Sequence, residues 1–219
     1  MADLRRLFGT RIEAVVAYGG RAPEWSHCMV LVSSLTMDDL TGLAAAVPKW
    51  HARGLATPLV MPREEFARSL DTFPVEYGEI IDTHEVLAGR DPFAGVILHP
   101  ADLRRGLEHR AASHLLHVRE NYIHSGGRPA AVTALVKDSA PGFETLLRRM
   151  ARLDGTPVEG PGQLARWAAA RTPLDARVVG DVLAVANEPS PAVDAVRLLP
   201  EYLQALETLL RVIDKWPVP

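Results

Sequence analysis

The sequence predicts an α/β (α+β) domain with a mixed sheet over residues 1–99, followed by an all-α helical bundle over residues 100–219. Two observations carry this prediction. Before Pro100, short apolar runs alternate with amphipathic segments, as expected for strands that alternate with helices. After Pro100, strand-like runs almost vanish, and apolar residues recur at helical spacing over long stretches. Each part has the size of an ordinary domain.

The first part begins with a short helix from Asp3 to Gly9, which the glycine ends. Residues 12–18 and 29–33 are apolar and predict two buried strands on either side of the pair Gly19-Gly20. Thr36 has the position of an N-cap, because two acidic residues follow it in the first turn of the next helix.

Two more strands and a helix complete the first part. Residues 57–61 predict a third strand, which Pro58 confines to a sheet edge or a strand start. A helix is expected from Pro62, because proline and acidic residues favour the first turn. Residues 79–87 predict the fourth strand, before a break at Gly89-Arg90-Asp91-Pro92.

The second part is predicted to be helical. The expected helices cover residues 102–125, 129–153, 163–170, 174–186 and 192–216. The last of them is apolar enough to bury one face inside the bundle and another at a homodimer interface.

Composition and charge restrict the function classes. The formal net charge is −3, which gives no general attraction to nucleic acid. Cys28 is the only cysteine, so neither an intramolecular disulfide nor a cysteine-based zinc site can form. No apolar run of a signal peptide follows the N-terminus, and no stretch of about 18 apolar residues would span a membrane. We therefore expect a cytoplasmic protein that does not insert into a membrane.

The most informative motif is Ala17-Tyr18-Gly19-Gly20 at the end of the first predicted strand, with a second apolar strand after it. The glycine pair fits two interpretations, a phosphate-binding turn or a plain turn that binds nothing. The motifs of P-loop ATPases, dinucleotide-binding dehydrogenases and α/β-hydrolases are absent, which excludes these common readings of an α/β domain.

The chain resembles the DNA polymerase β-like nucleotidyltransferase superfamily in the order of its elements. That order is strand, glycine turn, strand, helix, strand, helix and strand, followed by a helical bundle. The two-part layout is similar to that of the minimal and the aminoglycoside nucleotidyltransferases. The resemblance implies that Gly19 and Gly20 bind the phosphates of an NTP through backbone N–H groups. It also implies carboxylates that hold Mg²⁺ or Mn²⁺, because metal-assisted phosphoryl transfer uses hard cations with oxygen ligands.

The chain departs from this pattern at the carboxylates. In the superfamily an Asp-x-Asp pair follows the turn, and the matching stretch here is Ser26-His27-Cys28-Met29. A third acid corresponds to Asp82, Glu79 or Glu85 on the later strand, with Asp82 as the favoured match. One acid cannot hold two magnesium ions. We therefore predict a catalytically degenerate member of the superfamily that binds a nucleotide or a protein partner.

Two alternatives remain open. An active but divergent nucleotidyltransferase would use His27 and Asp82, with His27 replacing an aspartate as a ligand of Zn²⁺ or Mn²⁺. A solvated loop histidine is the plainer interpretation of His27. The other alternative is an RNase, because Arg119 and His124 match an Arg-x₄-His pattern that resembles the nuclease motif of small helical toxin domains. Five residues on a straight helix turn by about 140°, so the two side chains would diverge unless a dimer or the helix end at Gly126-Gly127 brings them together.

A band of polar side chains lies on the first predicted helix of the second part. It consists of His114, His117, Asn121 and His124, with Arg110 in the same sector. On an ideal helix the four fall within about 80° of one another. Histidines three residues apart can share a metal ion, but no acidic residue in this sector completes a ligand set. Histidines that cover an apolar core are the alternative interpretation.

Overall fold

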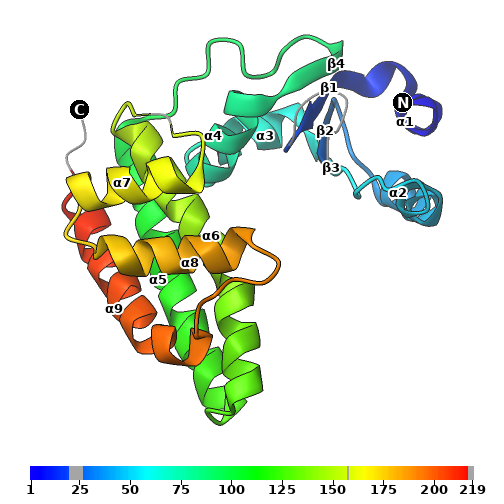
Figure 1. The fold of residues 1–219 in the computed structure, drawn as a ribbon. Helices are drawn as coiled ribbons and strands as arrows, with labels where there is room; N and C mark the ends of the chain where they lie inside the picture. Colours follow the sequence, from blue (N-terminus) through cyan, green and yellow to red (C-terminus); the bar gives the residue numbers. More distant parts are fainter. Residues whose placement is uncertain (20–26, 157, 217–219) are drawn as a thin grey trace. The chain divides into compact units, whose positions relative to one another are not determined.

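The computed structural model describes residues 1–19, 27–156 and 158–216, so Gly20 of the glycine turn and Ser26 lie outside the described residues. The chain divides into two compact units, Met1–His99 and Pro100–Pro219. The first unit holds a four-stranded mixed sheet, and the second consists mostly of helices (Figure 1). The predicted order of an α+β part and a helical part is confirmed.

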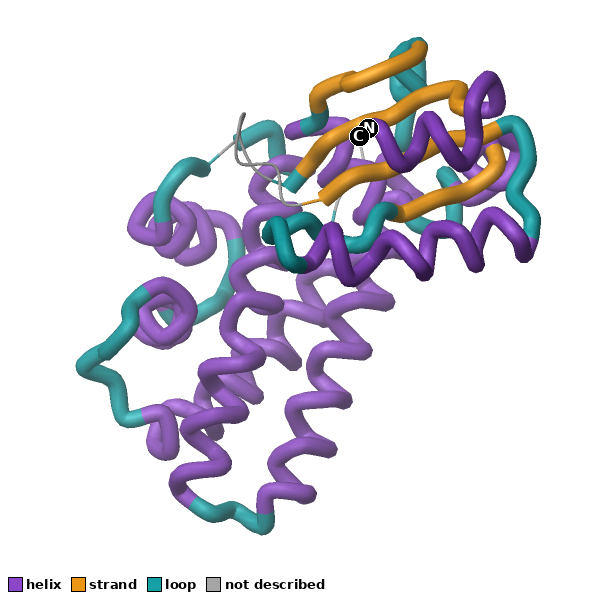
Figure 2. The backbone as a smooth tube through the Cα atoms, turned by 90° about the vertical axis from the view of Figure 1, so that its right-hand side faces the viewer, coloured by secondary structure: helices purple, strands orange, loops and turns teal. Residues whose placement is uncertain are grey.

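The sheet has the strand order β3-β2-β1-β4 (Figure 1), and Figure 2 shows its strands in orange. The strands are β1 (Ile12–Tyr18), β2 (His27–Val32), β3 (Leu59–Pro62) and β4 (Glu85–Gly89). The central strand β1 is antiparallel to both β2 and β4, whereas β3 is parallel to β2. A helix separates β2 from β3 in the chain, as a parallel pair requires, because the connection must cross over the sheet. β3 lies at an edge of the sheet, as the nearby Pro58 predicted.

Helices cover both faces of this sheet. They are α1 (Ala2–Phe8), α2 (Met37–His51), α3 (Arg63–Ser69) and α4 (Pro74–Thr83), and a 3₁₀ turn, η1 (Gly9–Arg11), leads from α1 into β1. The helices α1 and α2 pack on one face, and α3 and α4 pack on the other (Figure 1). The middle of β1 and of β2 is therefore buried on both sides, which explains why these strands are apolar throughout.

Aromatic side chains form the core on each face. On the α1 and α2 face, valines of β1 and β2 pack against Phe8 and Trp50. On the other face, the rings of Phe66, Tyr77 and Phe93 contact one another against the sheet. Truncation of such a buried ring to alanine typically costs about 3–5 kcal/mol, so both faces contribute strongly to the stability of this unit.

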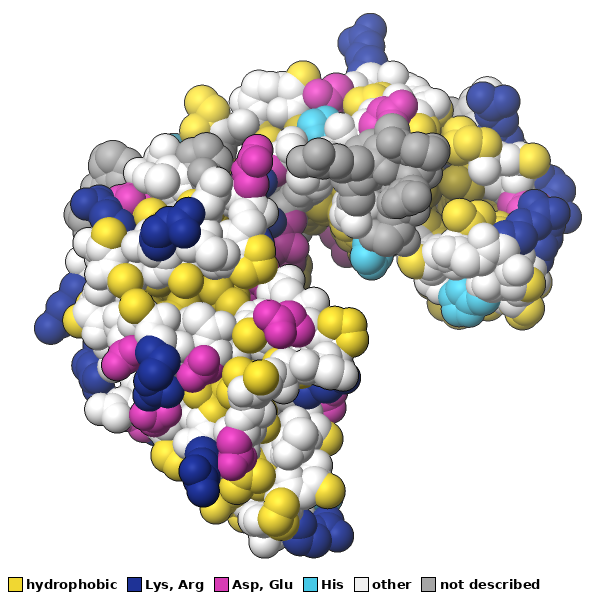
Figure 3. Space-filling view, in the orientation of Figure 1, with side chains coloured by type: hydrophobic (Ala, Val, Ile, Leu, Met, Phe, Trp, Pro, Cys, Tyr) yellow, Lys and Arg dark blue, Asp and Glu magenta, His cyan; other side chains and the backbone are white. Residues whose placement is uncertain are grey.

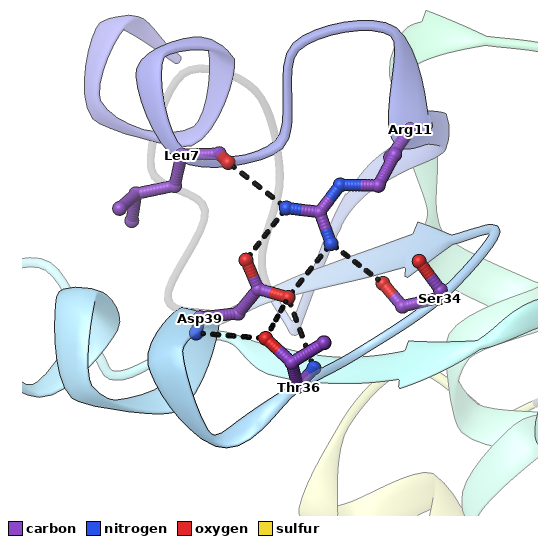
Figure 4. A network of polar contacts seen from close by, with 5 residues as sticks. All are labelled: Leu7, Arg11, Ser34, Thr36 and Asp39. Carbon is purple, nitrogen blue, oxygen red and sulfur yellow. Dashed lines mark hydrogen bonds and ion pairs between the residues drawn. The ribbon is translucent and has the colours of Figure 1, made fainter.

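A polar network around Asp39 holds the start of α2 (Figure 4). The Arg11 guanidinium donates two hydrogen bonds to the Asp39 carboxylate, at 2.6 and 2.7 Å, and one to the Leu7 carbonyl at 3.1 Å. In a capping box, the Asp39 N–H donates to Thr36 Oγ1 at 3.2 Å and the Thr36 N–H donates to Asp39 Oδ2 at 2.9 Å. The predicted N-cap at Thr36 is confirmed. The bonds from Arg11 hold the pKa of Asp39 well below its usual range.

The prediction of one strand over residues 79–87 is wrong. The helix α4 continues to Thr83, and β4 begins only at Glu85. Pro74 occupies the first helical turn, where its fixed φ favours a helix. One side of α4 is buried through Pro74, Val75, Tyr77 and Ile80. Packing of this side against the sheet favours a helix, although the same stretch contains two consecutive isoleucines that suit a strand.

The second unit consists of α5 (Pro100–Ser125), α6 (Pro129–Leu153), α7 (Pro161–Arg171), α8 (Ala176–Asn187) and α9 (Ala195–Asp214). The predicted helices agree closely with these bounds. Gly126 and Gly127 join α5 to α6 in a hairpin, and both adopt positive φ. The largest fully buried side chains of this unit include Leu107, Phe143, Leu146, Leu147, Leu183, Tyr202, Leu206 and Leu209.

The surface of the helical unit mixes charges of both signs. On the face that Figure 3 shows, Lys and Arg side chains are interspersed with Asp and Glu. This pattern agrees with the small net charge of the chain. A search of the described residues finds no helix that combines the length and apolar character needed to cross a membrane.

Candidate functional site

The candidate site of the first unit lies at the end of β1, where the glycine turn begins. Gly19 has a φ of 79°, in the left-handed region that favours glycine. The strand register places Ala17 opposite Cys28 of β2 and opposite Glu85 of β4. Cys28, Ala17 and Glu85 therefore form one row across three strands, beside the turn.

His27 lies next to this row, paired with Tyr18 in the ladder between β1 and β2. The two rings stack, with centroids 5.3 Å apart and planes inclined by 22°. Burial raises the pKa of Tyr18, so its phenol stays protonated at neutral pH. The stacked ring gives the solvent-exposed His27 side chain a defined position at the end of the strand.

An apolar cavity of about 270 Å³ opens beside the same row. Its walls come from α1, the ends of β1 and β2, the C-terminal end of α2 with the segment after it, and β4. They include Leu4, Ala17, Cys28, Trp50, Leu55 and Leu87. His27 also lines the cavity, and the described residues around it include no carboxylate. The cavity therefore favours a flat or aliphatic group and lacks the oxygen ligands that Mg²⁺ requires.

The indole of Trp50 is held in place by α1. Its N–H donates to Asp3 Oδ2 at 3.0 Å, and Lys49 Nζ donates to Asp3 Oδ1 at 3.0 Å. The hydrogen bond from Trp50, followed by that from Lys49, lowers the pKa of Asp3. Because Asp3 stays ionised, both bonds persist at neutral pH and this wall of the cavity is preformed.

Cys28 is a wall residue rather than a nucleophile. Burial raises the pKa of its thiol, and the S–H donates weakly to the Met29 carbonyl at 3.9 Å. A thiol that stays protonated neither attacks an electrophile nor binds a metal efficiently. Cys28 therefore does not replace the missing aspartate chemically.

The three candidate acids fall on two different elements. Glu79 and Asp82 lie on α4, and only Glu85 lies on β4, in the row with Ala17 and Cys28. In residues 1–19, 27–156 and 158–216, no group of three or more His, Cys, Asp or Glu side chains could hold a metal ion. The strand register thus connects Glu85, rather than the favoured Asp82, with the end of β1.

The second unit carries a separate polar groove of about 470 Å³ between α5 and α6. From α5 it is lined by the predicted band, His114, His117, Asn121 and His124. Residues at the start of α6 and along it include Arg128, Ala131, Ala134, Asp138 and Ser139. The neighbouring helix therefore supplies the acidic residue that the band itself lacks on α5.

His114 differs from the rest of the band. Its Nε2 lies 2.9 Å from the Tyr202 hydroxyl, and a Cβ added at Gly142 would lie only 2.7 Å from its Cε1. The ring therefore occupies the space that Gly142 leaves open. Burial, and secondarily His117 and Arg110, lower the pKa of His114. His114 is a neutral histidine of the bundle core, and its role is structural.

Arg119 and His124, the two residues of the RNase interpretation, lie on different surfaces of the helical unit. Arg119 pairs with Glu207 of α9 at 2.6 Å, whereas His124 lines the groove between α5 and α6. Their side chains diverge, as the angle between them on a helix predicts. Within one chain they do not form a common site.

For some residues that line the two sites, the sequence alone gives little indication that they belong to a site. Trp50 and Leu55 reach the cavity because α1 and α2 pack on the same face of the sheet. Asp138 lines the same groove as the histidines because α5 and α6 form a hairpin. A weak signal does exist on α6, since Arg128, Ala131 and Asp138 recur at helical spacing and share one face.

No model of a known protein family matches the chain, and no curated protein matches it either.

Proposed function

We propose that the chain is a catalytically degenerate, nucleotidyltransferase-like protein whose first unit binds a nucleotide. One observation carries the proposal: Gly19 adopts positive φ at the end of β1, two residues beyond Ala17, which lines the apolar cavity. The cavity would take the base through apolar contacts. The glycine turn would bind the phosphates, as the resemblance to the superfamily implies.

The row Cys28, Ala17 and Glu85 supports binding without transfer. Metal-assisted phosphoryl transfer requires several oxygen ligands around the phosphate. This row offers one carboxylate and one thiol whose pKa is raised. The residues present therefore do not fit a pair of Mg²⁺ ions, and we expect a bound NTP to stay intact.

Thermal unfolding with and without each of the four NTPs, in Mg²⁺ and in Mn²⁺, tests the proposal, because a ligand that binds only the folded state raises the Tm. Ala56 lines the cavity, so Ala56→Phe should fill it. Ala67 is an exposed residue of α3, so Ala67→Phe adds the same ring outside the cavity. We expect a nucleotide-dependent rise in Tm that Ala56→Phe abolishes and Ala67→Phe retains.

Two results would contradict the proposal. A Tm that no NTP changes would remove nucleotide binding and direct the search to a protein partner. Transfer of NMP from an NTP to an acceptor would instead establish an active enzyme. In that case Asp82→Ala and Glu85→Ala would show which acid the reaction uses.

A further inference from the structure

The groove between α5 and α6 gathers polar side chains that the bundle itself does not use. Within the described part of the chain, the side chains of Asn121, His124 and Asp138 make no hydrogen bond or ion pair. The ring of His117 is bonded at one nitrogen, Nδ1, which lies 3.0 Å from the Ser113 carbonyl. Because a carbonyl only accepts, Nδ1 carries the proton, and Nε2 remains for another partner.

The guanidinium of Arg128 is anchored at the hairpin end of this groove. Its Nε–H donates to the Ser125 carbonyl at 3.0 Å. The buried Ser125 hydroxyl donates to the Tyr122 carbonyl at 2.6 Å and accepts from the Gly127 N–H at 3.1 Å, which fixes the turn. The two terminal nitrogens of Arg128 are left without a partner in the described residues. A guanidinium held in this way presents a planar pair of donors, which suits an oxyanion.

The charges of the groove are separated along its length. Arg128 and Asp138 are ten residues apart at the start of α6 and along it, which corresponds to about 15 Å along a helix axis. Asp138 therefore does not neutralise Arg128. Between them α6 presents Ala131 and Ala134, whose small side chains leave the groove open.

From this geometry we propose that the hairpin end of the groove binds the phosphate of a small phosphomonoester through Arg128, His124 and Asn121. The remainder of the ligand extends along the groove toward His117 and Asp138. Three separate donor groups suit a tetrahedral phosphate with three terminal oxygens better than a planar carboxylate with two. A metal ion fits less well, because the groove has a single acid and the described residues hold no three-ligand cluster.

The titratable and charged groups that face the groove are His114, His117 and His124 from α5, and Arg128 and Asp138 from α6. From α9, the Tyr202 hydroxyl lies 2.9 Å from His114 Nε2. Burial, and secondarily His117 and Arg110, lower the pKa of His114. His124 is the histidine of the groove that comes closest in the sequence before the hairpin turn, where we propose that the phosphate binds.

Titrations followed through the histidine Cε1–H resonances test this site. The probes are inorganic phosphate, ribose 5-phosphate and unphosphorylated ribose, all at the same fixed pH. His124→Gln identifies the His124 resonance by its loss. We expect ribose 5-phosphate to shift that resonance, inorganic phosphate to shift it at higher concentration, and ribose to leave it unchanged.

Two pairs of variants locate the site. Arg128→Gln should weaken binding of ribose 5-phosphate at least about tenfold, since it removes a charge-assisted pair of hydrogen bonds. The matched control Arg197→Gln alters an exposed arginine of α9 and should change nothing. His124→Gln should weaken binding, whereas His109→Gln, on the same helix but outside the groove, should not.

Each contrary outcome overturns the proposal. Absence of any shift with either phosphate probe removes the site. Equal shifts for wild type and Arg128→Gln show diffuse charge attraction only, and a shift with ribose alone shows a site that does not recognise phosphate. Because all four substituted residues are exposed, unchanged circular dichroism and Tm confirm that a lost signal reflects lost binding. The variant Ala56→Phe distinguishes this site from NTP binding in the first unit, because it fills the apolar cavity and leaves the groove between α5 and α6 intact.

Discussion

In the first unit both faces of β1 and β2 are buried under helices, whereas in the second unit α5 packs against α9 and keeps a polar side toward a groove. In β1 and β2 only the strand ends reach solvent. The cavity at these ends is apolar except for His27 and Cys28. The groove of the second unit carries Arg128 near one end and Asp138 toward the other. A sheet covered on both faces therefore leaves an apolar cavity, for which we propose recognition by shape. The helical hairpin leaves a polar groove, for which we propose recognition by charge.

The largest effect is expected from Gly89→Ala in the first unit. Gly89 has a φ of 79°, and an added Cβ would lie 1.9 Å from the Glu13 carbonyl oxygen. Positive φ alone costs an alanine about 1–2 kcal/mol, and the overlap with the backbone of β1 must add to this. Chemical unfolding monitored by circular dichroism should show a loss well above that value.

Gly95→Ala is the matched control for this substitution. Gly95 has a φ of 77°, but an added Cβ would meet nothing within 4 Å. Its loss of stability should stay near the conformational cost alone. Equal losses for the two variants would show that close approach of β4 to β1 does not limit the stability of the unit.

A smaller effect is expected from Asp39→Asn, and it depends on pH. The folded pKa of Asp39 lies below the unfolded value of about 3.9, because Arg11 and Thr36 stabilise the carboxylate. The stabilisation is therefore fully present above the unfolded pKa and is lost as the pH falls from that value through the lower folded pKa. Asp39→Asn should lower the Tm at neutral pH and flatten the acid dependence below about pH 4. The matched control is Asp38→Asn, at the exposed neighbouring position, which leaves the bonds of Asp39 with Arg11 and Thr36 in place.

In the second unit, Tyr202→Phe should cost about 1 kcal/mol, the usual contribution of a hydrogen bond, because it removes the partner of His114. Tyr122→Phe removes an exposed hydroxyl and should cost nothing measurable.

The pH dependence of the second unit should differ from that of the first. The folded pKa of His114 lies below the unfolded value of about 6.5. Stability is thus complete above that pH and declines as the pH falls below it. His114→Gln should remove this decline in unfolding curves collected between about pH 7 and about pH 5. A decline that persists in the variant would assign the effect to another histidine.

The smallest expected effect is the dependence of ligand binding on ionic strength, which should differ between the two sites. Salt at about 0.5 M screens exposed charges strongly compared with about 0.05 M. Binding of ribose 5-phosphate to the groove should therefore weaken several-fold across this range. Occupation of the apolar cavity by a nucleoside should hardly change. A salt-insensitive groove would contradict recognition by charge.

Local signals in the sequence determined several elements almost to the residue. The apolar run Ile12–Tyr18 forms β1 as predicted, because a valine-rich segment that ends in glycines suits a buried strand. Thr36 caps α2 because its hydroxyl satisfies a backbone N–H of the first turn. The second unit is helical because its apolar residues keep a helical period over long stretches. The band His117, Asn121 and His124 followed from the same geometry.

Contacts between distant segments decided the rest. The stretch after Pro74 contains residues that suit either a helix or a strand. Packing of Tyr77 and Ile80 against the sheet stabilises the helix, which continues to Thr83. The register of β4 against β1, which no local pattern encodes, places Glu85 and not Asp82 in the row with Ala17. The cavity and the acidic side of the groove likewise arise where separate elements pack together. Spacing along a chain determines which residues share a face, but only packing determines what that face meets.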